Sequence, residues 1–170
     1  MTAQMDIEKI YEAYFADVYF YVRRLSGSEH IAEEITSETF FRALRSAAGF
    51  RGACDIRVWL CQIAKNCYFS YCKKAGRTVS LDATALEAVA DPAAPPDEAV
   101  CRKLEAERLR RRVHALPDPY REVLMWRMFA ELSFRQIGAI FHRSDNWACV
   151  TCHRAIRMLK NGLEGECHET

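Results

Sequence analysis

Residues 133–159 read SFRQIGAIFHRSDNWACVTCHRAIRML, and their pattern predicts a pair of helices. Ser133 followed by Gln136 matches a capping box, in which each side chain bonds a free backbone N–H at the start of a helix. Residues 142–144 form a short break, and a second helix is expected from about residue 145 to 161. A short capped helix, a tight turn and a longer helix have the proportions of a helix-turn-helix, which places its second helix in the DNA major groove.

The second helix of this pair has two distinct faces. Its spacing buries four small or apolar residues, Ala148, Cys152, Ala155 and Leu159. It exposes Asn146, Trp147, Cys149, Val150, His153, Arg154 and Arg157. Arginines on such a face can neutralise phosphates. The pattern alone also fits a pair of packed helices in any bundle, so DNA binding stays one of two interpretations at this point.

Apolar residues recur at three- and four-residue steps in three further segments before residue 77. The first segment ends at Gly27, the second runs from about His30 to Ala47, and the third begins after Asp55, a plausible N-cap. We expect Leu44 to lie beside the buried stripe of the second segment. Gly76 ends the third segment.

Residues 78–97 separate these three helices from the C-terminal lobe. This stretch is rich in Ala, Asp and Pro, and Val79 to Val100 contains five acids and no Lys or Arg. Residues 91–96 (DPAAPP) cannot form a helix interior. After this flexible acidic linker we expect Leu109 to face inward and Pro119 to start a helix. The fold class is therefore all-α, with two small helical domains.

The composition agrees with a folded domain protein: 170 residues, 50% hydrophobic and 28% charged. No segment approaches the length of an apolar membrane span, and the N-terminus lacks the pattern of a secretory signal, so we expect a cytoplasmic protein. Its eight cysteines are then expected as reduced thiols. The sequence shows no catalytic set of residues, and we predict neither an enzyme nor a cofactor or metal.

Two independent stretches resemble the bacterial RNA polymerase sigma factors. Residues 115–160, ALPDPYREVLMWRMFAELSFRQIGAIFHRSDNWACVTCHRAIRMLK, look like region 4, which reads the −35 element. Residues 32–40 (AEEITSETF), 50–52 (FRG) and 59–66 (WLCQIAKN) resemble region 2. The chain has no room for other regions and is similar to the short extracytoplasmic-function (ECF) group. The resemblance implies a three- to four-helix region 2 at 1–77, a linker at 78–97 and region 4 at 98–170.

The resemblance also implies which residues make contacts. Docking on the clamp helices of the polymerase is expected of Glu34, Ser37, Glu38 and Phe41. Contact with the −10 element, including capture of an unpaired base by the loop 50–56, is expected of Phe50, Arg51, Gly52, Cys54, Lys65 and Asn66. Contact with the −35 element is expected of Trp147, Cys149, Val150, His153, Arg154 and Arg157.

Three positions depart from the family's pattern. Cys149 is neutral where the family commonly has a basic residue, His142 stands where a turn glycine is usual, and Ser70 stands where Asp is preferred. A non-glycine residue at positive φ carries a conformational cost, although His tolerates it better than most. These departures leave the promoter sequence open without changing the predicted fold.

The implied partners are core RNA polymerase (clamp helices and flap), promoter DNA and an anti-sigma factor, often membrane-anchored, with no small-molecule substrate. The free lobes are expected to move independently.

Two alternatives remain open: a free-standing helix-turn-helix regulator that binds duplex DNA as a dimer, and a metal or thiol sensor built on Cys149, Cys152 and His153. The sensor is disfavoured because Cys152 is expected to point inward and Cys149 outward, and no second CxxC pair exists to complete a zinc site.

Overall fold

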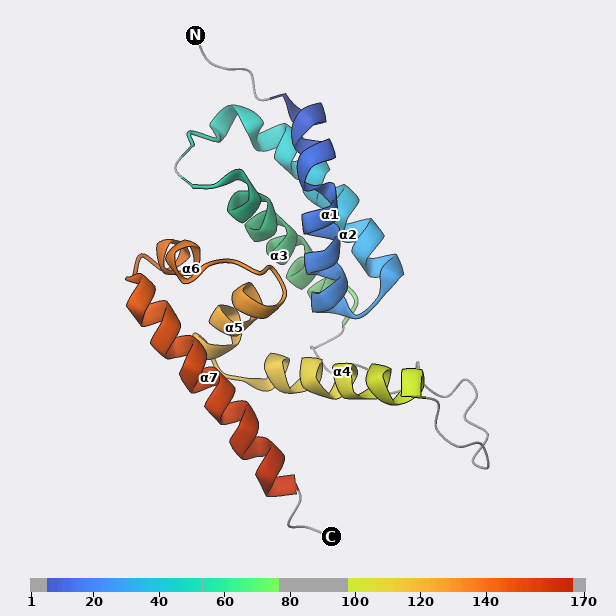
Figure 1. The fold of residues 1–170 in the computed structure, drawn as a ribbon. Coiled ribbons are helices and arrows are strands. Elements are labelled where there is room, and N and C mark those ends of the chain that lie inside the picture. Colours follow the sequence, from blue (N-terminus) through green and yellow to red (C-terminus); the bar gives the residue numbers. More distant parts are fainter. Residues whose placement is uncertain (1–5, 53, 77–97, 167–170) are drawn as a thin grey trace.

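The computed structural model describes residues 6–52, 54–76 and 98–166, and side chains as far as residue 162. Within these ranges the chain forms α-helices, one short 3₁₀ helix and no strand, which confirms the predicted all-α class (Figure 1). The elements are α1 (Ile7–Ser26), α2 (Glu29–Ser46), η1 (Ala47–Gly49), α3 (Ile56–Lys74), α4 (Glu98–Ala115), α5 (Tyr120–Met128), α6 (Phe134–Ile140) and α7 (Asp145–Glu166). The predicted linker at 78–97 lies outside the described residues.

The N-terminal lobe, α1–α3, is a bundle in which each helix packs against the other two. Local sequence signals set the helix ends. Ser28 Oγ accepts a hydrogen bond from the N–H of Ile31 at the start of α2, and Asp55 Oδ1 accepts one from the N–H of Arg57 at the start of α3. Gly27 ends α1 with a φ of 76°, a left-handed conformation that suits glycine. The predicted cap at Asp55 and stop at Gly27 are confirmed.

Leu44 differs from the sequence expectation, because its side chain is 55% exposed. The buried residues of α2 are Ala32, Ile35, Thr36, Thr39, Phe40 and Ala43. Leu44 follows Phe41 by three residues, and Phe41 is equally exposed, so the two share an outward face of the helix. The spacing places Leu44 at the edge of the apolar stripe, and none of the helices that the structure describes covers that edge.

The C-terminal lobe, α4–α7, is built around α5, which packs against α4, α6 and α7. The structure corrects three details of the expected elements. Leu109 is 40% exposed because α4 buries only Val113 and His114 near its C-terminal end. Helix α5 begins at Tyr120, just after Pro119, and α7 continues to Glu166, beyond the predicted end.

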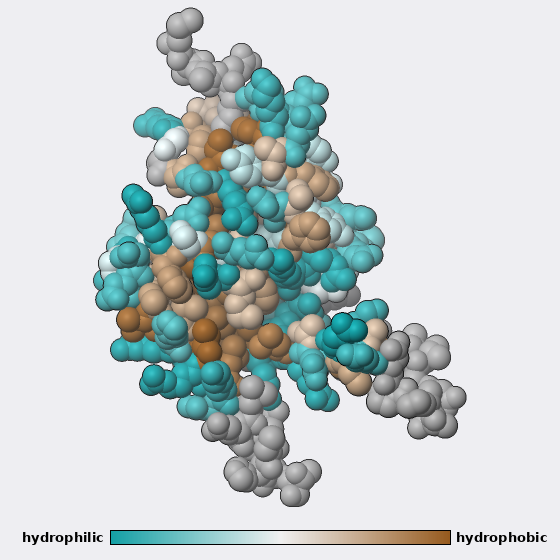
Figure 2. All heavy atoms as spheres, viewed as in Figure 1, coloured by the Kyte–Doolittle hydropathy of each residue, from teal (hydrophilic) through white to brown (hydrophobic). Residues whose placement is uncertain are grey.

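Buried hydrophobic side chains from both lobes form one cluster, so the lobes are in contact rather than separate. Two helices whose backbones run close together over several residues always belong to the same lobe. The two lobes therefore meet mainly through their side chains. The lobes therefore pack together in this structure, and their independent motion stays a prediction. On the face shown in Figure 2, hydrophilic side chains cover most of the surface and hydrophobic patches gather over the C-terminal lobe. Among the described residues, no helix has the length and apolar character of a membrane span.

Candidate polymerase-docking and nucleic-acid surfaces

The turn between α6 and α7 is tight and closely packed. The capping box is present as predicted: Ser133 Oγ accepts from the N–H of Gln136 (3.2 Å), and Gln136 Oε1 accepts from the N–H of Ser133 (2.9 Å). His142 adopts a φ of 53°, the left-handed conformation expected at its turn position. A Cβ atom on Gly138 would lie 2.8 Å from the carbonyl oxygens of Arg143 and Ser144. The geometry therefore fixes the angle at which α7 leaves the turn.

The outer face of α7 carries most of the predicted −35 contacts. Val150, His153, Arg154 and Arg157 are exposed, as predicted. Trp147 is half-buried instead of exposed because its ring packs against Phe141, with 5.3 Å between ring centroids. The remaining predicted side chain, Cys149, is also half-buried rather than exposed.

A shallow hollow of about 300 Å³ lies on this face, lined by His153, Ile156, Arg157 and Lys160. Sequence reasoning missed Ile156 and Lys160 as part of this surface, although Lys160 follows Arg157 and His153 at helical spacing and that signal was available. Among residues 145–162 of α7, whose side chains the structure describes, Asp145 is the single acidic one. The face that carries His153, Arg157 and Lys160 is therefore positively charged, as phosphate contact requires.

The loop before α3 holds four of the predicted −10 residues. Arg51, Gly52 and Cys54 are exposed, while Phe50 is half-buried against Trp59, with 4.8 Å between ring centroids. Gly52 has a φ of 68°, a conformation that favours glycine. Ala53 lies outside the described residues. The loop thus exposes backbone and polar groups beside an aromatic pair, which is a suitable surface for an unstacked base.

The two predicted −10 residues on α3 differ in their accessibility. Asn66 is exposed, whereas the Lys65 side chain is only 19% exposed. Lys65 Nζ lies 2.8 Å from Glu122 Oε1 and 5.5 Å from the centre of the Trp126 ring, and both partners belong to α5. Lys65 is therefore engaged by the C-terminal lobe in this structure.

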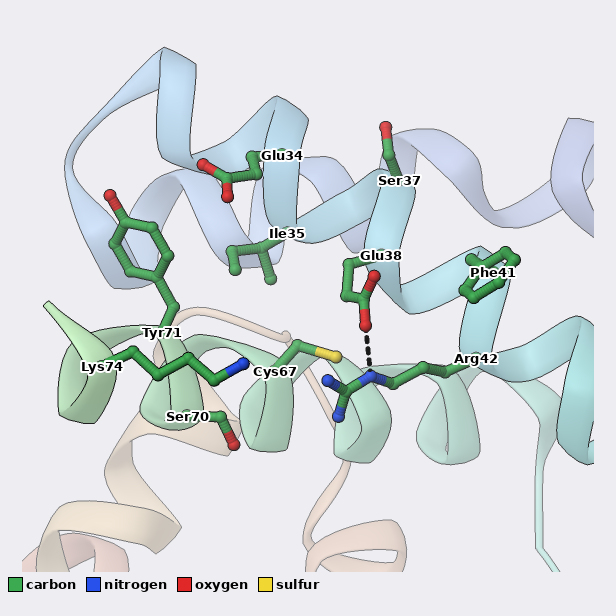
Figure 3. Close-up of a pocket in the computed structure, with 10 residues that line it drawn as sticks. All are labelled: Glu34, Ile35, Ser37, Glu38, Phe41, Arg42, Cys67, Ser70, Tyr71 and Lys74. Carbon is green, nitrogen blue, oxygen red and sulfur yellow. Dashed lines mark hydrogen bonds and ion pairs between the residues drawn. The ribbon is translucent and has the colours of Figure 1, made fainter.

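The predicted polymerase contacts come together along one groove between α2 and α3, of about 520 Å³ (Figure 3). Glu34, Ser37, Glu38 and Phe41 all line it from α2, together with Ile35 and Arg42. Glu34, Ser37 and Phe41 are exposed, and Glu38 is half-buried in an ion pair with Arg42 (Oε1 to Nε, 2.5 Å). One face of α2 thus presents the aromatic ring of Phe41, the exposed carboxylate of Glu34 and the ion pair of Glu38 with Arg42.

The opposite wall of this groove comes from α3, through Cys67, Ser70, Tyr71 and Lys74. Sequence reasoning did not include these residues in the docking surface. Nothing in the local pattern relates Lys74 to Glu34, because only the packing of α3 on α2 brings them to one groove. Arg42 could have been found, since it follows Glu38 by four residues and an acid–base pair at this spacing meets on a helix surface.

The cysteines that the structure describes form no metal site for the sensor alternative. Burial raises the pKa of the Cys61 thiol to about 12, and burial also raises the pKa of Cys152. Thiols with raised pKa values are poor nucleophiles and poor metal ligands near neutral pH. Among the residues that the structure describes, no group of three or more His, Cys, Asp or Glu side chains lies close enough to hold a metal ion.

Comparisons with known proteins agree with the region 2 pattern. Residues 10–78 match the family model for Sigma-70 region 2. The chain is 28% identical to RNA polymerase sigma factor YlaC of Bacillus subtilis over 158 residues, which cover 92% of this chain and 91% of the relative. It is also 28% identical to the ECF RNA polymerase sigma factor SigM of the same organism, over 83% of this chain and 85% of the relative. The chain is similar to the ECF RNA polymerase sigma factors over most of its length.

Solved structures share the fold of this chain. CnrH, solved in complex with the cytosolic domain of CnrY, superimposes with a TM-score of 0.65 at 17% identity, covering 96% of this chain and 91% of CnrH. RpoE of Bartonella quintana, solved with the anti-sigma factor NepR, gives 0.60 at 19% identity, covering 94% and 97%. Both likenesses extend over α1–α3 and α4–α7, so the described part of the chain shares a known architecture.

Proposed function

We propose that this chain is an ECF sigma factor that binds core RNA polymerase, directs it to the −35 and −10 elements of a promoter and promotes strand opening there. The observation that carries the proposal is the gathering of all four predicted polymerase contacts along one groove of α2. Charged groups beside an exposed aromatic ring set the register of a docked partner and steer its approach. The positively charged outer face of α7 and the exposed loop before α3 supply separate surfaces for the two promoter elements.

The proposal divides the chain by role. Residues 1–77 act as region 2, residues 98–170 act as region 4, and residues 78–97 connect them. The chain catalyses no reaction itself, and it works in the cytoplasm where the polymerase is found. Residues of α7 meet duplex DNA, whereas the loop 50–56 and α3 meet a strand whose bases have left the stack. Individual contacts assigned above stay predictions.

An inhibitory protein partner is part of the proposal. CnrH was solved with the cytosolic domain of CnrY, and RpoE with the anti-sigma factor NepR. By analogy with these proteins of similar fold, we propose that an anti-sigma factor binds this chain and competes with the polymerase. The analogy names the class of partner and leaves its identity open.

Run-off transcription with purified core polymerase and a library of promoter fragments tests the proposal. The full chain is expected to co-elute with core polymerase and to yield transcripts from a subset of fragments, while core polymerase alone yields none from them. A gel shift on duplex DNA distinguishes a sigma factor from a free-standing regulator, because the regulator binds a specific duplex sequence without polymerase. Failure of the chain to associate with core polymerase, or no promoter-specific transcript, would overturn the proposal.

A further inference from the structure

The outward face of α7 carries a straight line of side chains, which we call the outer line. Its members are exposed and follow one another at steps of four, three and four residues: Asn146, Val150, His153 and Arg157. The same steps relate the buried residues Ala148, Cys152 and Ala155. A shift of two residues corresponds to about 200° around a helix, so the outer line lies opposite the buried one. Since α7 lies at the edge of the C-terminal lobe in Figure 1, the outer line is free to enter a DNA groove.

The first two turns of α7 are held firmly, and their flanking side chains are engaged. Ser144 Oγ accepts a hydrogen bond from the N–H of Trp147 (3.1 Å), which fixes the start of the helix. The Trp147 ring packs against Phe141, and Cys149 is half-buried. Asn146 and Val150 are therefore the leading side chains of the outer line. In a helix-turn-helix, residues near the start of the second helix are those that reach base edges.

The leading part of α7 carries no arginine or lysine. Residues 145–153 read DNWACVTCH, and the first such cation of the helix is Arg154. Contact of Arg or Lys with the O6 and N7 atoms of guanine is the commonest specific contact in the major groove. The first two turns of this helix cannot make that contact, so any base that they read is read by other chemistry.

Val150 and Asn146 each match one partner of an A·T pair. The Val150 side chain is 40% exposed and has no hydrogen-bonding group. The 5-methyl group of thymine is the apolar feature that a base edge offers to such a side chain in the major groove. The amide of Asn146 has both a donor and an acceptor, which suits the N7 and N6 atoms of adenine.

The spacing along the helix limits how far apart these bases lie. Asn146 and Val150 are four residues apart, which is about 6 Å along the axis of a helix. Consecutive base pairs are separated by about 3.4 Å, so the two side chains reach one base pair or two pairs at most two steps apart. Arg157 and Lys160 lie further along α7, in the charged hollow. Their charges suit phosphates, which position the protein without selecting a sequence.

We propose that Val150 selects a thymine through its 5-methyl group and that Asn146 selects an adenine within two base pairs of it, in the duplex −35 element. This inference rests on the proposed function and names the base pairs that the α7 surface reads. One apolar contact and one amide contact supply the sequence preference of this end of the helix. The cations behind them add affinity for any sequence.

Single-atom changes in the DNA test the inference. The holoenzyme, assembled from the full chain and core polymerase, selects its preferred duplex from a library of random sequences, and footprinting delimits the −35 region. Each thymine in that region is then replaced in turn by deoxyuridine, which lacks the methyl group. Each adenine is replaced in turn by 7-deazaadenine, which lacks the N7 acceptor. Both analogues keep Watson–Crick pairing, so a change in affinity reports the missing group in the major groove.

The wild-type holoenzyme should lose affinity at one thymine and one adenine. We expect a loss of about fourfold without the methyl group and of roughly tenfold without N7. Val150→Ala should erase the thymine effect alone, and Asn146→Ala should erase the adenine effect alone. Val150→Thr keeps one methyl group and should retain part of the thymine effect.

Two further variants of α7 are matched controls. Met158 is as exposed as Val150, at 40%, and Asn161 is exposed near the other end of the helix. Met158→Ala and Asn161→Ala should leave both analogue effects at their wild-type size. Circular dichroism checks that every variant remains helical. If Val150→Ala or Asn146→Ala weakens binding to normal and substituted duplexes by the same factor, that residue supports the fold only, and the inference is wrong.

The outcomes separate this inference from the proposed function. Promoter-specific transcription from an element without A·T pairs, or without loss at any analogue, overturns the inference and leaves the function intact. Sensitive bases more than two steps apart have the same consequence. If the chain does not associate with core polymerase, the function fails and the inference falls with it. Two losses, each erased by its own variant alone, support the assignment of Val150 to thymine and Asn146 to adenine.

Discussion

The indole ring of Trp126 lies against the phenol ring of Tyr21, with 5.5 Å between ring centroids and 17° between ring planes. One ring belongs to α5 and the other to α1, so the stack joins the two lobes through their most buried aromatic side chains. Aromatic pairs at this separation stabilise a structure beyond the area that they bury. The stack therefore couples the stability of the two lobes.

The hydroxyl group of Tyr21 should be dispensable, whereas its ring should not. The oxygen is buried and has no hydrogen-bond partner among the described residues, and burial raises its pKa well above the ordinary value. Tyr21→Phe removes an unsatisfied polar group, so we expect the free energy of unfolding to stay unchanged or rise by up to about 1 kcal/mol. Tyr21→Ala should lower it by about 3–5 kcal/mol. Urea unfolding measures both, and a loss above about 1 kcal/mol for Tyr21→Phe would contradict the assignment.

Acidification should weaken the contact between the two lobes through His114 of α4, whose Nε2 lies 3.1 Å from the carbonyl oxygen of Leu25 in α1. The pKa of His114 is lowered below the usual 6.5, mainly because burial disfavours the charged ring, and the charges of Arg110 and Arg121 lower it further. The hydrogen bond to the Leu25 carbonyl and the charge of Glu107 act in the opposite direction. A base whose pKa is depressed in the packed arrangement of the lobes stabilises that arrangement above pH 6.5, and this contribution is lost as the pH falls below 6.5 because the exposed ring takes up a proton first. We expect the radius of gyration of the free chain to increase between pH 7.5 and 5.5.

His114→Gln is the control for this pH effect. The amide can still donate to the Leu25 carbonyl but does not titrate, so the pH dependence of the radius should become flatter. Equal pH profiles for the wild type and His114→Gln would assign the effect to other groups.

Gly138→Ala should destabilise the turn before α7. The added Cβ would meet the carbonyl oxygens of Arg143 and Ser144 at 2.8 Å, and backbone atoms in a tight turn move little. Overpacking of this kind costs about 1–3 kcal/mol. Gly49→Ala is the matched control because a Cβ there meets no atom within 4 Å. Thermal unfolding compares the two, and equal midpoints would show that the turn relaxes around the methyl group.

Local sequence signals predicted most of the helices and their ends. They did not predict contacts between residues far apart in the sequence, and the reason is physical. Ser133, Gln136 and Asp55 act on atoms within a few residues, so their roles can be read from the sequence. Lys65 and Glu122 form an ion pair although 57 positions separate them in the sequence, and no local spacing predicts such a pair. Leu109 shows the same limit: its spacing assigns it to a face of α4, but burial depends on whether another element covers that face.

Phe41→Ala should weaken docking on core polymerase. Its ring is 55% exposed and lines the groove between α2 and α3, so it is free to enter a partner. Aromatic residues at the centre of an interface cost about 2 kcal/mol or more when truncated, which corresponds to roughly thirtyfold in Kd. Phe20→Ala is the matched control, since Phe20 is also 55% exposed but lies on α1 outside the groove. Equal losses from the two variants, measured by titration of labelled polymerase, would argue against the groove.

Arg157→Ala should reduce the affinity of the holoenzyme for duplex −35 DNA and its dependence on salt. The guanidinium group is exposed beside Lys160 and His153, where it can neutralise one phosphate. Losing one phosphate contact lowers the slope of log K against log salt by about 0.9 and weakens binding similarly for all sequences. Arg108→Ala, at an exposed position of α4, removes the same charge away from the hollow and should leave the slope unchanged. Fluorescence anisotropy from 50 to 300 mM salt measures the slope, and identical slopes for the two variants would exclude Arg157 from the DNA surface.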